Sequence, residues 1–166
     1  MNRSRQVVVC VGNRFRRDDS AGLHVAAWLR DRVPDPVEVL TLEGEPTTLL
    51  DVFDSSELVI LVDAVAGAGP VGIVHRFDAT DAPVPGSVFG ASTHALGLGE
   101  TIELARTLGR LHGRVVVYGI TGQDFDAGEE LTQPVADAVE RVAAEILRDV
   151  TSPARQSTDM KGASRA

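Results

Sequence analysis

The hydrophobic positions of the chain form two kinds of pattern, which alternate along most of its length. Short aliphatic runs, typical of buried strands, occupy residues 6–12, 37–44, 57–65, 72–77 and 114–121. Segments in which apolar residues recur every three or four positions, typical of helices, occupy residues 20–33, 45–53, 92–113 and 132–150. This alternation predicts the α/β class: a single three-layer domain with a mostly parallel five-stranded sheet and helices on both faces.

One of these strands cannot follow the parallel pattern. Only the sequence AGAGPV separates the strand at 72–77 from the strand at 57–65. A parallel crossover needs about a dozen residues or more, so we expect these two strands to form an antiparallel pair. The short strand should lie near an edge of the sheet.

The second half of the chain contains one weak and one strong helix. In the helix expected at 92–113, Leu104, Leu108 and Leu111 fall on one stripe, which predicts its buried face. The segment 78–91 is rich in Pro, Gly and Asp and is expected to be a loop. The strongest helix ends near residue 150, and the polar tail after it has almost nothing to bury. We therefore expect one α/β domain over 1–150 and a disordered tail over 151–166.

Composition narrows the possible partners. The 166 residues include 16 basic and 24 acidic side chains, giving a formal charge of −8, which argues against a nucleic-acid binder. A small basic patch of Arg14, Arg16 and Arg17 remains open. The single cysteine, Cys10, lies in an apolar run and should be a buried, inert thiol. No segment has the pattern of a signal peptide or the length of a membrane span, so we expect a cytoplasmic monomer without a membrane partner.

Carboxylates stand where predicted strands end. Ligands of α/β proteins gather beyond the carboxyl ends of the strands, which directs attention to Asp18 and Asp19 after the first strand and Asp63 at the end of LVILVD. Each has a structural alternative. Asp18 or Asp19 could cap the following helix, and Asp63 could be a turn residue.

A histidine could complete a site with these acids. His94 stands in ASTHALG, near a predicted helix start, although a lone histidine is more often structural. Two carboxylates and an imidazole suit Zn, Ni, Mn or Fe. A catalytic triad of Ser92, His94 and Asp63 is disfavoured, because Ser92 and His94 are only two positions apart and no G-x-S-x-G elbow is present. Neither a dinucleotide fingerprint nor a Walker motif occurs.

Four blocks of the sequence, in order over residues 6–150, resemble the hydrogenase maturation endopeptidases. They are VGNRFRRDDSAG, LVILVDAVAGAGPVG, STHALGLGETIELARTLG and VVVYGIT. The resemblance implies an endopeptidase that removes the C-terminal extension from the large-subunit precursor of a nickel-iron hydrogenase after nickel insertion. It also implies that Asp19, Asp63 and His94 are the catalytic, metal-contacting residues. The nickel would be carried by the substrate, and no organic cofactor is expected.

Three positions depart from the family pattern. Cys10 replaces the first glycine of the G-x-G-N turn, and Ser20 replaces the glycine after the acidic pair. The sequence LEGEP at 42–46 stands where many members have a Gly-Gly-Thr loop, in a region expected to touch substrate. An alternative function is therefore a non-catalytic maturation chaperone that binds the metal-loaded subunit. Asp18 is interpreted as a neighbour of Asp19 that caps the helix or tunes its charge.

Overall fold

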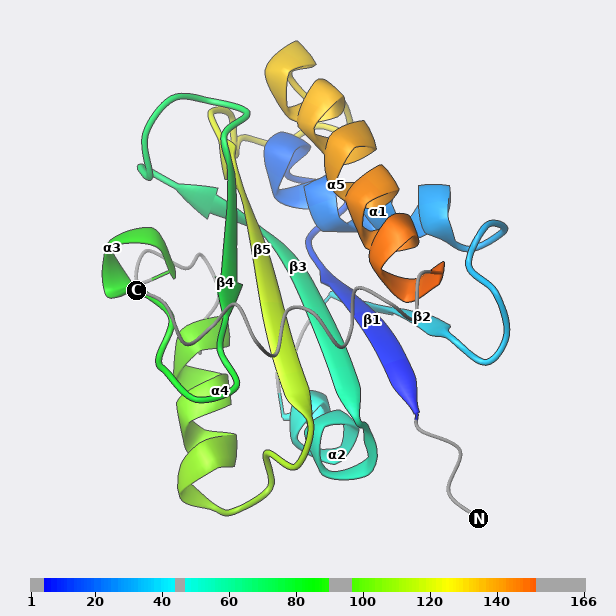
Figure 1. The fold of residues 1–166 in the computed structure, drawn as a ribbon. Coiled ribbons are helices and arrows are strands. Elements are labelled where there is room, and N and C mark those ends of the chain that lie inside the picture. Colours follow the sequence, from blue (N-terminus) through cyan, green and yellow to red (C-terminus); the bar gives the residue numbers. More distant parts are fainter. Residues whose placement is uncertain (1–4, 44–46, 90–96, 152–166) are drawn as a thin grey trace.

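The chain folds around one five-stranded sheet placed between two layers of helices (Figure 1). The computed structural model describes residues 5–43, 47–89 and 97–151. The strands lie in the order β2-β1-β3-β5-β4. Their bounds are Gln6–Val11 (β1), Glu38–Leu42 (β2), Leu58–Ala66 (β3), Val74–Asp78 (β4) and Arg114–Gly122 (β5). All neighbours pair in parallel except β4 and β5, so the predicted mostly parallel α/β fold is confirmed.

The helices divide between the two faces of the sheet. Helices α1 and α5 cover one face, and α2, α3 and α4 cover the other (Figure 1). Their bounds are Arg17–Ser20 (the 3-10 helix η1), Ala21–Leu29 (α1), Thr48–Ser55 (α2), Gly86–Phe89 (α3), Leu98–Thr107 (α4) and Gln133–Thr151 (α5). Within the described ranges, no helix combines the length and the apolar character needed to cross a bilayer.

Strand β3 shows how the sheet separates two cores. Ile60 and Val62 pack toward α1 and α5, whereas Leu61 and Val65 pack toward α2, α3 and α4. Successive side chains of a strand point to opposite faces, so Asp63 shares the face of Leu61 and Val65. Cys10, in neighbouring β1, is fully buried, as predicted, and burial raises the pKa of its thiol to about 12, which disfavours the reactive thiolate.

The edge strand β4 is antiparallel, as expected, but its partner was predicted wrongly. It pairs with β5, and β5 pairs with β3, so β4 and β3 are not neighbours. Strands lie about 4.8 Å apart, so the connection after β3 needs to span only about 10 Å to leave room for β5. Three glycines with positive φ, Gly67, Gly69 and Gly72, shape that connection.

The buried face of α4 also differs from the prediction. Leu104 and Leu108 are 39% and 55% exposed. The buried positions of α4 are instead Leu98, Thr101, Ile102 and Ala105. The helix ends at Thr107, and Gly109 follows with a φ of 68°, so the leucine stripe runs past the helix it was meant to define.

Two further expectations concern neighbouring segments. The loop predicted at 78–91 contains the short helix α3. Residues 90–96, with Ser92 and His94, lie outside the described residues, as does the tail after residue 151. The expected tail disorder and domain end therefore stay predictions.

Candidate functional site

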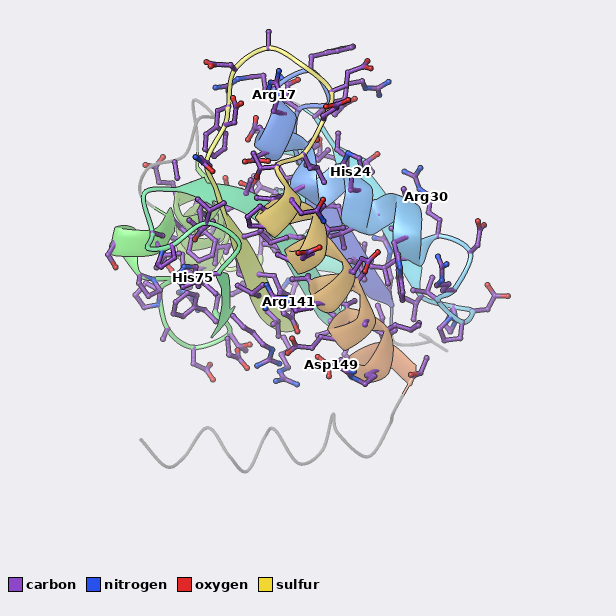
Figure 2. The ribbon with its side chains drawn as sticks, turned by 90° about the horizontal axis from the view of Figure 1, so that it is seen from above. Arg17, His24, Arg30, His75, Arg141 and Asp149 are labelled. Carbon is purple, nitrogen blue, oxygen red and sulfur yellow. The ribbon has the colours of Figure 1, made fainter. Side chains whose placement is uncertain are left out.

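The two predicted acids of the site, Asp19 and Asp63, lie in segments that are neighbours at the carboxyl edge of the sheet. Asp19 lies in η1, directly after β1, and Asp63 lies within β3, which pairs with β1. Asp63 does not end its strand, because β3 continues to Ala66. Figure 2 looks down on this carboxyl edge of the parallel strands, with Arg17 in η1, His24 in α1 and Arg30 at the end of α1.

A glycine brings these two elements together. A Cβ at Gly22, in the first turn of α1, would lie 2.3 Å from the carbonyl oxygen of Val11 and 3.0 Å from that of Val62. Only glycine allows so close an approach, so the start of α1 rests directly on the end of β1 and the middle of β3. Asp19, three residues earlier, is thereby placed beside the strand that carries Asp63.

Asp19 is buried, and the turn after β1 holds its backbone. Its side chain is 1% exposed, and its Oδ2 lies 3.6 Å from Arg16 Nη1. The amide of Asn13 donates to the Asp19 carbonyl at 3.0 Å, and the Asp19 amide donates to the Arg16 carbonyl at 3.0 Å. These bonds fix the position of the carboxylate, and the nearby guanidinium balances part of its charge.

Asp63 is a buried carboxyl group in an unfavourable electrostatic environment. It is 5% exposed, and its Oδ1 accepts a hydrogen bond from the Ala64 amide at 2.8 Å. Burial raises the pKa of Asp63 well above its usual range, and the negative charge of Asp19 raises it further, although the Ala64 bond opposes this. The two carboxyl groups therefore interact electrostatically, and a cation between them would relieve their repulsion.

Asp18 does not cap the helix, one of the two roles predicted for it, because neither η1 nor α1 has a side-chain cap. Its Oδ2 accepts from the amides of Gln123 and Asp124 at 2.9 and 3.0 Å, and its Oδ1 accepts from the amide of Thr132 at 2.8 Å. The Thr132 hydroxyl adds further bonds at 3.0 and 2.9 Å. Burial opposes ionisation, but these bonds together lower the pKa of Asp18. Asp18 thus ties η1 to the loop after β5.

Backbone contacts reinforce this tie. The Arg17 amide donates to the Gly128 carbonyl at 3.0 Å, and the Gly128 amide donates to the Phe15 carbonyl at 2.9 Å. Arg17 has a φ of 43°, a left-handed conformation that is costly for a residue with a side chain. The strained residue immediately precedes the two acids, and the loop after β5 holds it in place.

The three arginines before the acids do not form a basic patch. Arg14 makes two bonds to Glu43, at 3.0 and 2.8 Å, Arg16 faces Asp19, and Arg17 lies 3.6 Å from Asp124. Sequence reasoning missed the contact of Thr132 with Asp18, because no local spacing reveals that the loop after β5 reaches η1. It also missed the contact of Arg16 with Asp19, which lies only three positions away.

The third predicted ligand, His94, lies outside the described residues, so its position relative to Asp19 and Asp63 stays a prediction. Within the ranges that the structure describes, no group of three or more His, Cys, Asp or Glu side chains could hold a metal ion. Asp19 and Asp63 supply two coupled oxygen donors, which suit a cation but do not by themselves complete a metal site.

Comparison with known proteins identifies the family. The family model described as hydrogenase maturation protease matches residues 23–149, which include Asp63 and His94. The chain belongs to the hydrogenase maturation protease family. Membership supports a protease, and hence a hydrolase. The match begins after Asp19, so the role of that residue does not follow from it.

Solved hydrogenase maturation proteases share the fold. The HycI protease from Thermococcus kodakarensis has a TM-score of 0.71 and 24% identity, covering 90% of this chain and 94% of its own. The endopeptidase HybD from E. coli has a TM-score of 0.69 and 20% identity, with coverage of 89% and 92%. HycI from Escherichia coli gives 0.70 and 24%, also with 89% and 92%. Among curated proteins, a sequence comparison finds no match.

Proposed function

We propose that this hydrogenase maturation protease removes the C-terminal extension of a nickel-iron hydrogenase large-subunit precursor after nickel insertion. Family membership supports proteolysis in hydrogenase maturation. The observation that carries the proposal for the site is the pair of buried, electrostatically coupled acids, Asp19 and Asp63. Perturbed acids at the carboxyl edge of an α/β sheet are typical of functional sites.

In this proposal Asp19, Asp63 and His94 contact nickel that the substrate already holds. A precursor without nickel would present no cation to the two acids, and the raised pKa of Asp63, caused by burial and the charge of Asp19, would favour its protonated form. A loaded precursor would offset the repulsion between the acids. The same residues would then act as a checkpoint for nickel insertion.

The chemical step is hydrolysis of one peptide bond. The oxygen of a water molecule attacks the scissile carbonyl carbon, the C–N bond breaks, and the departing amine takes up a proton. Nickel in the substrate could polarise that carbonyl or activate that water. The part of this chain is to position the nickel-bearing segment against Asp19, which the β1–α1 turn and Arg16 hold in place.

Incubation with nickel-loaded and nickel-free precursor tests the proposal. The intact mass of the loaded precursor should fall by that of its extension, and the nickel-free precursor should stay whole. A loaded precursor that binds without being shortened would contradict the proposal and favour the maturation chaperone.

The variant His94→Ala tests the predicted third ligand. It should abolish processing of loaded precursor while circular dichroism shows an unchanged fold. An imidazole ligand must be neutral, so wild-type activity should also fall as the pH drops through about 6.5. Full activity in a folded His94→Ala variant would remove His94 from the mechanism.

A further inference from the structure

A cavity of about 380 Å³ lies beside the candidate site, between α1 and the end of β2. One wall is a single stripe of α1 and its two flanking residues: Ser20, Leu23, His24, Ala27 and Arg30. These positions follow helical spacing and lie opposite the stripe that α1 buries in the core. The other wall consists of Arg14, Thr41, Glu43 and Glu129.

The cavity begins next to the proposed catalytic acids. Ser20, at its near end, directly follows Asp19 and ends η1. From Ser20 to Arg30 the helix rises by about 15 Å. An extended peptide advances about 3.3–3.6 Å per residue, so this stripe has the length of about four extended residues.

The charges around the cavity leave one cation available. Arg14 and Glu43 form a two-bond ion pair and neutralise each other. Partial desolvation lowers the pKa of His24, so its ring is neutral at pH 7. Among contacts between described residues, the guanidinium of Arg30 makes one hydrogen bond, a long one of 3.4 Å to the neutral Thr41 hydroxyl.

The remaining anion belongs to the other end of the cavity. Glu129 directly follows Gly128, which the Arg17 amide binds beside the catalytic acids. The two ends of the cavity therefore carry opposite charges. Glu129 lies at the end near the catalytic acids, and Arg30 lies at the far end of α1. On the α1 wall, Leu23 and Ala27 form a small apolar patch between these charges.

We infer that this cavity binds an extended segment of the precursor next to the scissile bond. Arg30 pairs with a carboxylate of that segment, about four residues from the scissile bond. The inference rests on the proposed function, because the occupant is the chain being cut. It adds a recognition site outside the acids: Leu23 and Ala27 contact the extended chain, and Arg30 selects an acidic group. Such a pair contributes mainly to substrate binding and to the choice of substrate.

Two variants test the cavity in independent ways. Arg30→Glu reverses the charge that would pair with the precursor carboxylate. Ala27→Trp places a large side chain in the cavity from an exposed position of α1. With nickel-loaded large-subunit precursor as substrate, each should raise KM about tenfold and leave kcat within about twofold. Arg148→Glu, on the exposed side of α5, makes the same charge change elsewhere and should leave both constants unchanged.

Charge exchange identifies the partner of Arg30. Acidic residues of the precursor within about six residues of the cut, including a terminal carboxylate if one falls there, are replaced or masked one at a time. One change to Lys should weaken processing by the wild type and restore it for Arg30→Glu. If no change restores it and KM of Arg30→Glu equals that of the wild type, the inference is wrong.

The outcomes separate the inference from the proposed function. If the wild type binds the loaded precursor but does not cut it, the proposed function fails, and the ratio of dissociation constants for Arg30→Glu and wild type decides the inference. A tenfold ratio supports it and an equal affinity overturns it. If the wild type neither binds nor cuts the precursor, both are overturned.

Discussion

The adjacent residues Asp18 and Asp19 have the same side chain but different surroundings and different roles in the structure. Asp18 accepts hydrogen bonds from three backbone amides and a hydroxyl in the segment 123–132, so it is ionised and structural. Asp19 has the Arg16 guanidinium 3.6 Å away and raises the pKa of Asp63. Residue type and local spacing alone do not distinguish the two acids, because the loop that binds Asp18 lies about a hundred positions further along the chain.

Replacing Asp18 with Asn should weaken the tie between η1 and the loop after β5. An amide nitrogen cannot accept hydrogen bonds, so one set of donors loses its partner, at a cost of about 1–3 kcal/mol. This corresponds to a fall in Tm of about 2–12 °C for a domain of this size. The measurement is thermal unfolding at pH 7, together with kcat on loaded precursor, which should fall as Asp19 loses its support.

The matched control is Asp126→Asn, an exposed acid in the same loop, which should change neither Tm nor kcat. The effect should also depend on pH. The pKa of Asp18 is lowered by folding, so its stabilisation is complete above the unfolded value of about 3.9 and is lost as the pH falls through the lower folded value. A difference in Tm that persists undiminished at the acid end would contradict this role.

Replacing Asp63 with Asn should have the opposite effect on stability. Burial and the charge of Asp19 raise the pKa of Asp63, so the folded state holds a proton that the unfolded state releases above about pH 3.9. Stability of the wild type therefore falls as the pH rises through that window. Asn keeps an acceptor for the Ala64 amide without the charge, and should raise stability at pH 7 by about 0.5–2 kcal/mol while abolishing processing.

Differential scanning calorimetry of both proteins from pH 4 to pH 7 checks this. The advantage of Asp63→Asn should be small at pH 4 and should grow toward pH 7. A variant that is less stable than the wild type at pH 7 would show that the carboxylate is stabilised by the fold, and that the two acids do not repel each other.

At the scale of elements, the hydrophobic pattern predicts the five strands of the sheet and the helices α1, α2 and α5 to within a few residues. Helix α4 spans Leu98–Thr107, whereas the pattern predicts a helix over 92–113. Alternation of apolar runs is a direct consequence of burial on one or both faces, so it is readable locally. The partner of β4 is not readable in this way, because pairing depends on where β5, much later in the chain, inserts.

The candidate site follows the same division. Asp19 and Asp63 are predictable because strands of one sheet present their carboxyl ends along one edge. The Asp18 hydrogen bonds, the left-handed Arg17 and the α1 cavity are not, because each depends on contacts between η1 or α1 and distant loops. The misread stripe of α4 has a simpler reason: Leu104 lies on the exposed side of the helix, and the helix ends at Thr107, before Leu108 and Leu111.

The contact of α1 with the sheet gives a prediction at this scale. A Cβ at Gly22 would meet backbone carbonyls of β1 and β3, which cannot move aside as a side chain can. Gly22→Ala should therefore push α1 away from the sheet, lower Tm and reduce processing, even though alanine favours helices. Overpacking of this kind costs about 1–3 kcal/mol.

The control for Gly22→Ala is the same change at Gly86, the first residue of α3, where an added Cβ has no neighbour within 4 Å. Thermal unfolding of both variants separates the clash from any general effect of losing a glycine. Equal Tm values for Gly22→Ala and the wild type would mean that α1 does not depend on this close approach to hold Asp19 in place.

At the scale of the whole molecule, the described residues form two cores, one on either side of the sheet. Helix α5 fills one of them with Val135, Val142 and Ile146, and its described end at Thr151 is polar. The remaining sequence, TSPARQSTDMKGASRA from residue 151, carries one methionine and no other large apolar side chain. The sequence after residue 151 therefore has few apolar side chains that could be buried in either core.

Deletion of residues 152–166 should leave Tm and processing nearly unchanged. Ordering a residue costs about 1–2 kcal/mol of backbone entropy, and a segment this polar cannot bury enough apolar surface to offset that cost. Thermal unfolding of the full and shortened chains, followed by the cleavage assay, makes the comparison. A shift in Tm within about 2 °C agrees with the prediction, since about 1 kcal/mol corresponds to about 2–4 °C in a domain of this size. A fall of many degrees would show that the tail docks on the domain, whereas an unchanged Tm with a raised KM would show that it contacts the precursor.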